Sequence, residues 1–228
     1  MLKVIVFDGY GTLFFTGTGS VDATAEILAV NGRPDISPKA FYGEWKTLHH
    51  QHMAELPDFR LEQDIYALDL EELYGKYGFT RDAGKDVEIM LRIQGTRVAF
   101  PEVKQVLEKL SERFLLAIGS TTDTAPLQED LHRAELPIPS SRIFTSQSLK
   151  VYKPHQAFYR AILGELNVLP EEALFVGDSL TDDVKGPQAV GMRTCWVNRK
   201  GEGRGDVCPD LEISSLEELP AAIDHLMR

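Results

Sequence analysis

Three short hydrophobic segments each end in a polar side chain that can take part in catalysis: residues 4–8 end in Asp8, 114–120 in Ser120 and 173–178 in Asp178. β-Branched and aromatic residues dominate these segments, which is typical of buried strands. The carboxyl ends of parallel strands meet at one edge of a sheet, so we expect the three side chains to lie together. A carboxylate that follows an apolar strand and precedes Gly9 and Gly11 is placed as a nucleophile or a metal ligand.

The loop after a fourth such segment, residues 142–146, carries Lys153, and Asp183 follows shortly after Asp178. A lysine at this edge of the sheet would neutralise the nucleophile and hold an anionic substrate. The hydroxyl group of Ser120 would bind an oxyanion. Carboxylates about 4 Å apart repel each other by about 4 kcal/mol per pair at an effective dielectric constant of about 20. A cation must offset this repulsion, and hard oxygen ligands favour Mg²⁺.

The order of the predicted elements indicates an α/β fold. Five predicted strands alternate with amphipathic helical patterns, and they span residues 4–8, 114–120, 142–146, 173–178 and 193–198. Connected units of this kind form a Rossmann-like, doubly wound parallel sheet with its ligand crevice at the carboxyl ends of the strands. Near the C-terminus, Ser215 and Glu218 form a capping-box pattern that predicts the start of a last helix.

The segment 16–97 has a different pattern. Its helical periodicities contain no strand-like run, and they span residues 21–30, 41–53, 61–77 and 87–96. We therefore expect a helical cap domain at 16–97, inserted into a core domain of residues 1–15 and 98–228 and acting as a lid over the crevice. Within this segment, His49, His50 and His52 lack matching Cys or carboxylate ligands, so we interpret them as surface or packing residues.

Four sequence motifs in order resemble those of the haloacid dehalogenase superfamily of hydrolases that use an aspartate nucleophile. The motifs read FDGYGTLF, LLAIGSTTD, LKVYKPHQAFY and LFVGDSLTDDVKGPQAVGM, and the resemblance covers essentially the whole chain. It implies that Asp8 is the covalent nucleophile, that Ser120 binds the transferred group and that Lys153 steadies the intermediate. It also implies that Asp178 and Asp183 serve a metal and that the helical insert is a cap domain.

The complete set of expected site residues is larger than these five. We expect Tyr10 to act in catalysis and at the metal, and we expect four further residues to bind substrate: Thr12, Thr121, Tyr159 and Lys46.

Two branches of the superfamily match different parts of the sequence. Phosphatases of the family usually carry a second Asp two residues after the nucleophile, as a general acid and base, where this chain has Tyr10. Tyrosine there resembles the 2-haloacid dehalogenases, which displace halide without a metal, and so do Tyr159 and the segment TCWVNR at 194–199. Those dehalogenases have a small neutral residue at Asp178 and an Asn at Thr121. They also have a cap Arg where this chain offers only Lys46.

The balance of charge favours the phosphatase interpretation. A haloacid would add its carboxylate to those of Asp8 and Asp178, with only Lys153 available as a cation, whereas Mg²⁺ would use the same carboxylates as ligands. A general acid typically contributes about 10² to 10⁴ in rate, and its loss matters least when the leaving group needs no proton. We therefore expect Mg²⁺-dependent hydrolysis of a small phosphorylated metabolite, such as an acyl phosphate. The alternatives are a 2-haloacid dehalogenase and a non-catalytic binding protein on the same scaffold.

Composition limits the partners. The chain has 228 residues and a formal net charge of -11, so its own field would repel nucleic acids, and an anionic substrate needs a local cation. Two cysteines, Cys195 and Cys208, indicate a reducing compartment. The sequence shows no signal-peptide pattern and no apolar stretch of membrane-spanning length. We expect a cytoplasmic protein, monomeric or homodimeric, that binds a small anionic metabolite but no nucleic acid or membrane.

Overall fold

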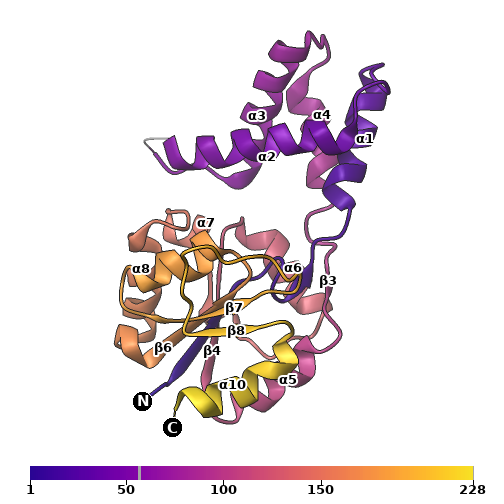
Figure 1. Ribbon diagram of the computed structural model, residues 1–228. Coiled ribbons are helices and arrows are strands. Elements are labelled where there is room, and N and C mark those ends of the chain that lie inside the picture. The colour runs from indigo at the N-terminus through magenta and orange to yellow at the C-terminus, as the bar shows by residue number, and fades with distance from the viewer. Residues whose placement is uncertain (56–57, 228) are drawn as a thin grey trace. The chain divides into compact units, whose positions relative to one another are not determined.

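The computed structural model describes residues 1–55 and 58–227, which form two compact units (Figure 1). The core unit consists of Met1–Phe15 and Val98–Arg228, and the helical unit consists of Thr16–Arg97. Among the described residues, no helix is long and apolar enough to cross a membrane.

A six-stranded, fully parallel sheet forms the centre of the core unit. Its spatial order is β5 (Ile143–Thr145), β4 (Leu115–Ser120), β1 (Val4–Phe7), β6 (Ala173–Gly177), β7 (Arg193–Val197) and β8 (Leu211–Ile213). The predicted α/β fold and its five predicted strands are confirmed, with ends that differ by one residue at most. The edge strand β8 was not predicted: Glu212 in its middle is exposed and Leu211 is only partly buried, so it lacks the hydrophobic run of the other strands.

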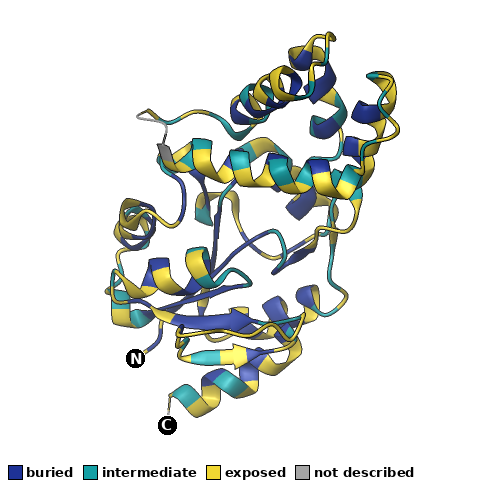
Figure 2. Cartoon of the chain, turned by 45° about the horizontal axis from the view of Figure 1, so that its top comes forward, coloured by how far each residue is buried: buried dark blue, intermediate teal, exposed yellow. Residues whose placement is uncertain are grey.

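Alternating side chains of the central strand β1 face opposite sides of the sheet, as the pleat requires. Ile5 and Phe7 belong to one apolar cluster and Val4 and Val6 to another, and all four are fully or almost fully buried (Figure 2). The first cluster includes residues of α5 (Val103–Ser111), α6 (Thr124–Arg133) and α10 (Leu219–Leu226), and the second includes residues of α8 (Gln156–Leu166). Helices on both faces make the sheet doubly wound.

Short elements complete the core unit. They are α7 (Ser146–Leu149), α9 (Gly186–Gln188), the π-helix η3 (Leu180–Lys185) and three 3₁₀ turns, η1 (Ser140–Arg142), η2 (Pro170–Glu172) and η4 (Leu216–Glu218). The predicted capping box is confirmed: the Ser215 side chain accepts a hydrogen bond from the backbone N–H of Glu217, and Glu218 Oε1 accepts one from the Ser215 N–H. A two-stranded antiparallel ribbon of β2 (Phe14–Phe15) and β3 (Val98–Ala99) was not predicted.

The described residues of the helical unit form four helices: α1 (Gly19–Val30), α2 (Pro38–Glu55), α3 (Glu62–Tyr77) and α4 (Ala83–Leu91). The prediction of residues 87–96 for the last helix was wrong at both ends. Its start is fixed at Asp82, whose side chain caps the helix by accepting from the N–H of Lys85 at 3.3 Å. Its end precedes Gly95, which has a positive φ of 68°.

Helix α2 contributes an aromatic stripe to the core of the helical unit. Trp45 is fully buried, and its indole N–H donates to the carboxylate of Asp69 on α3 at 3.2 Å. The Nδ1 atoms of His49 and His52 lie 2.6 Å from the two oxygens of the same carboxylate. His50 is exposed, and its Nδ1 lies 2.6 Å from the carbonyl oxygen of Lys46. These histidines therefore take part in packing and local hydrogen bonding.

Candidate active site

The sheet places three predicted site residues at its carboxyl edge. Asp8 directly follows β1, Ser120 ends β4, and Asp178 directly follows β6. These three strands are neighbours in the sheet, with β1 between β4 and β6. Asp8 and Ser120 are buried, while Asp178 is partly exposed. The parallel arrangement therefore brings Asp8 to the same edge as Ser120 and Asp178, which both lie more than 100 positions further along the sequence.

The ammonium group of Lys153 joins two of the acidic residues. Its Nζ atom donates to Asp8 Oδ1 at 2.8 Å and to Asp183 Oδ1 at 2.7 Å, and the lysine side chain is only 2% exposed. Burial alone lowers the pKa of Lys153, but the charges of Asp183 and Asp8 raise it well above its usual value. Lys153 is thus a fixed cation between two carboxylates.

Asp183 reaches this position because the chain turns sharply after β6. The Ser179 side chain caps η3 by accepting from the Asp182 N–H at 3.1 Å, and the Ser179 N–H donates to Asp183 Oδ2 at 2.9 Å. Any Cβ at Gly177 would overlap the Asp183 side chain, so the close approach requires glycine there. The turn therefore directs the Asp183 carboxylate to the end of the strand.

Three carboxylates converge at this edge. Among the described residues, one group of metal-ligating side chains comes together: Asp8, Asp178 and Asp183, whose nearest oxygens all lie within 4.8 Å of one another. Burial, together with the charges of Asp183 and Asp178 and against the effect of Lys153, raises the pKa of Asp8 to about 8. Burial and the charge of Asp183 raise the pKa of Asp178 to about 6. Lys153 alone does not compensate three adjacent carboxylates.

The loop between Asp8 and β2 fits closely against Asp178. Gly11 has a φ of 98°, and any Cβ at this position would overlap the Asp178 carboxylate. Both features require glycine, because a side chain disfavours positive φ and has no room here. The backbone of the first motif at Gly11 therefore packs directly against Asp178 of the fourth motif.

Three buried oxygen atoms of the first and second motifs have no hydrogen-bond partner within the described part of the chain: Asp8 Oδ2, Thr12 Oγ1 and Thr121 Oγ1. Buried polar atoms are almost always paired in folded proteins, so these unpaired atoms need an explanation. Thr12 follows the nucleophile candidate in the first motif, and Thr121 follows Ser120 in the second. Their hydroxyl groups are available to a bound ligand.

The phenol group of Tyr10 is held by Asp130, a residue outside the four sequence motifs. Its hydroxyl donates to Asp130 Oδ2 at 3.0 Å, and Asp130 is completely buried on α6. A signal for Asp130 was present, because at helical spacing it shares the buried face of α6 with Leu127 and Leu131. A charged residue on an apolar face needs a partner, and Tyr10 supplies one.

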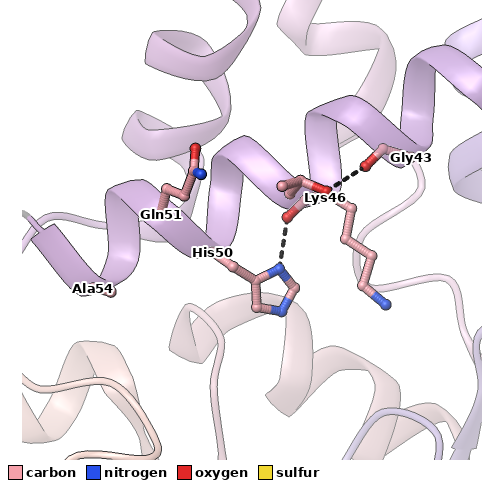
Figure 3. A pocket seen from close by; sticks show the side chains of 6 residues that line it. Gly43, Lys46, His50, Gln51 and Ala54 are labelled. Atoms are coloured by element: carbon pink, nitrogen blue, oxygen red, sulfur yellow. Dashed lines mark hydrogen bonds between the residues drawn. The ribbon is translucent and has the colours of Figure 1, made fainter.

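Tyr159 and Lys46 lie in different environments. Tyr159 is completely buried, and its hydroxyl donates to the backbone carbonyl of Asp182 at 2.5 Å, so it supports the η3 turn. Lys46 is exposed on α2 of the helical unit. There it lines an open surface pocket of about 500 Å³ together with other residues of the same helix, which are Gly43, Thr47, His50, Gln51 and Ala54 (Figure 3).

Comparison with known proteins shows relatives of two activities. The (S)-2-haloacid dehalogenase 4A of Burkholderia cepacia is 27% identical over 99% of this chain and 93% of that protein. The haloacetate dehalogenase H-2 of Moraxella sp. is 32% identical over 99% of this chain and 98% of that protein. The glyceraldehyde 3-phosphate phosphatase of Pyrococcus furiosus is 35% identical, over 42% of this chain and 40% of that protein.

The fold also matches a solved structure, that of the L-2-haloacid dehalogenase of Xanthobacter autotrophicus. The TM-score is 0.76 at 22% identity, with 98% of this chain and 99% of that chain covered. The family model for haloacid dehalogenase-like hydrolases matches residues 2–191. With four motifs, the sheet topology and the family model in agreement, the chain belongs to the haloacid dehalogenase-like hydrolases and is a hydrolase.

Proposed function

We propose that this hydrolase cleaves a small phosphorylated metabolite with Mg²⁺ and that Asp8 is its covalent nucleophile. The observation that carries this proposal is the position of Asp178, which brings a third carboxylate to within 4.8 Å of Asp8 and Asp183. A site that attacks a haloacid without a metal gains nothing from this third charge.

The residues present fit a magnesium ion. All the candidate ligands are carboxylate oxygens, which Mg²⁺ prefers, and Asp8 Oδ2 has no hydrogen-bond partner among the described residues. When all three carboxyl groups are ionised, they and the one ammonium group leave two negative charges, which a divalent cation balances. A haloacid without a metal would raise the excess to three. Asp8, Asp178 and Asp183 would hold the ion, and when bound it would neutralise the charge on the transferred group.

The chain's own groups account for the remaining steps. Lys153 holds the Asp8 carboxylate through Oδ1 and so fixes it for attack on phosphorus. As the bond between Asp8 and phosphorus forms, the bond from phosphorus to the leaving oxygen breaks, and the departing group carries the electron pair. The hydroxyls of Ser120, Thr12 and Thr121 would donate to the oxygens of the transferred group. A water oxygen then bonds to phosphorus while the bond between phosphorus and Asp8 breaks, with its electron pair returning to the carboxylate. Asp8 is regenerated, and inorganic phosphate leaves with the protons of the water.

Tyr10 narrows the range of substrates. The phosphatases of the family usually place a second carboxyl group at this position, whereas the phenol proton of Tyr10 is donated to Asp130. A leaving group that needs no proton suits this arrangement best. We therefore propose an acyl phosphate or another phosphate compound with a good leaving group as the substrate class.

Lys46 is the residue of the helical unit that we propose for substrate binding. It lines the open pocket on α2, and its ammonium group forms no ion pair within residues 1–55 and 58–227. An exposed, unpaired ammonium group beside a pocket suits an anionic part of a small metabolite.

A 2-haloacid dehalogenase is the second candidate. It is supported by the two dehalogenases that match this chain over nearly its whole length, at 27% and 32% identity. In that reaction an Asp8 oxygen would form a bond to the carbon that carries the halogen, and halide would leave with the electron pair. Tyr10 resembles this branch, whereas Asp178 does not.

The test is an assay of purified protein on acetyl phosphate, a set of phosphate monoesters and L-2-chloropropionate, each with Mg²⁺ and with chelator. We expect inorganic phosphate in the presence of Mg²⁺, a loss of at least about 100-fold with chelator, and recovery when Mg²⁺ is restored. Chloride released equally with chelator would replace the proposal by the dehalogenase. Binding of substrate without either product would indicate a non-catalytic binding protein.

A further inference from the structure

Arg199 lies near the candidate site but has no role in the mechanism above. It comes two residues after the end of β7, at the carboxyl edge of the sheet, next to β6 and its site residue Asp178. Its side chain is 18% exposed. A largely buried guanidinium group at this edge must be compensated by the groups around it.

Three groups surround the Arg199 guanidinium. Its NH1 atom lies 2.8 Å from Glu102 Oε1, and its NH2 atom donates to the backbone carbonyl oxygen of Thr12 at 3.1 Å. Its plane lies against the ring of Phe100, with 3.6 Å between the guanidinium carbon and the ring centroid. A planar fork with several donors can make all three contacts at once, whereas a lysine ammonium group cannot.

The contact with Thr12 is the one that reaches the site. Thr12 belongs to the five-residue segment that starts at Asp8, and its own hydroxyl is buried without a hydrogen-bond partner in the described part of the chain. The preceding residue, Gly11, is packed against the Asp178 carboxylate. A shift of the Thr12 backbone would therefore move the Thr12 hydroxyl and alter the packing contact between Gly11 and the Asp178 carboxylate.

The partners of Arg199 are themselves well anchored. The Glu102 side chain is 10% exposed, and its Oε1 atom also accepts from the Ser215 hydroxyl at 3.4 Å. Phe100 donates its backbone N–H to the carbonyl of Leu13, the residue after Thr12, at 3.0 Å. Arg199 thus connects the start of α5, the end of β7 and the loop after β1.

We propose that Arg199 is a positioning residue that holds the Asp8 to Thr12 loop in its active conformation through the Thr12 carbonyl. This inference rests on the proposed function, because the loop matters only if Asp8 and Thr12 act on the transferred group. Positioning errors of about 1 Å reduce turnover strongly even when binding is retained.

The test compares Arg199→Lys with Arg193→Lys, an exposed arginine at the start of the same strand. Arg199→Lys keeps a positive charge beside Glu102. It loses the several N–H donors of the guanidinium group, which reach Glu102 and the Thr12 carbonyl together, and it loses the contact with the Phe100 ring. We expect its kcat to fall about 10- to 100-fold with KM within about threefold of the wild-type value, a size typical of residues that orient catalytic groups. Arg193→Lys should change neither parameter.

Two further measurements separate positioning from simple stabilisation. The first is thermal unfolding of Arg199→Ala, which we expect to be cooperative, as for a folded protein. The second is its activity with added guanidinium at millimolar concentration, which we expect to rise because the free ion can occupy the contacts that the Arg199 side chain made. An unchanged kcat in Arg199→Lys beside an active wild type would overturn this inference alone, as would a loss in Arg199→Ala that guanidinium does not reverse. A wild type that releases neither phosphate nor halide would overturn the proposed function and this inference with it.

Discussion

Asp8→Asn is expected to reduce product release by a factor on the order of 10⁴ or more. An amide oxygen is a far weaker nucleophile than a carboxylate, so the bond to the transferred group would not form. The same change removes the charge that Lys153 contacts at 2.8 Å. The measurement is steady-state release of phosphate and of halide under the conditions that support the wild-type enzyme.

Asp182→Asn is the matched control for Asp8→Asn, because it makes the same chemical change beside the site but outside the group of three carboxylates. We expect its turnover to stay within about threefold of wild type, since its backbone carbonyl, which accepts from Tyr159, is retained. An Asp8→Asn protein with more than a few per cent of wild-type turnover would mean that Asp8 is not the nucleophile.

Lys153→Met is expected to have the second-largest effect, on both catalysis and stability. It removes a buried cation that contacts Asp8 at 2.8 Å and Asp183 at 2.7 Å, and the two carboxylates are left facing each other. Removing one partner of a buried ion pair typically costs about 3–5 kcal/mol in the free energy of unfolding. We also expect turnover to fall by about 10³-fold or more, because the Asp8 carboxylate is no longer held for attack.

Urea denaturation with and without Mg²⁺ measures the stability effect of Lys153→Met. We expect the ion to stabilise this variant more than the wild type, since it would replace part of the missing positive charge. Lys185→Met, at an exposed position on η3, is the control and should behave like the wild type. Wild-type stability and turnover in Lys153→Met would contradict the electrostatic account of the site.

Much of the fold was predictable because its strands are buried on both faces. Residues 173–176, for example, form an uninterrupted hydrophobic run, and all five residues of β6 are buried. The ribbon of β2 and β3 was not predictable in this way. Its strands have two residues each, and Phe15 and Val98 remain 58% and 71% exposed, so no hydrophobic pattern marks them.

The site residues that end a strand were predictable from the sequence. The contacts that join residues far apart in the sequence were not. Asp8, Ser120 and Asp178 follow from strand ends alone, because parallel topology brings such ends together. The contact between Tyr10 and Asp130 spans 120 positions, and that between Arg199 and Thr12 spans 187. No local spacing predicts contacts of that length, although the buried position of Asp130 on α6 offered a hint.

For Tyr159 the motif indicates a position close to the site residues but does not determine what the side chain does there. The sequence suggested substrate binding, and this remains a prediction. In the structure its hydroxyl is bonded to the Asp182 carbonyl, and any Cβ at Gly186 would overlap its ring. These contacts place Tyr159 behind the η3 turn that carries Asp183. Its replacement by Phe would therefore act on the site through Asp183.

Calorimetric titration of the purified protein with Mg²⁺, beside the variant Asp178→Asn, tests the proposed magnesium site most directly. We predict one ion bound per chain and at least about tenfold weaker binding in Asp178→Asn, because one of three carboxylate ligands is replaced by a neutral amide. Mg²⁺ binding that is absent, or that is equal in the two proteins, would contradict the assignment of Asp8, Asp178 and Asp183 as a magnesium site and would favour the metal-independent dehalogenase.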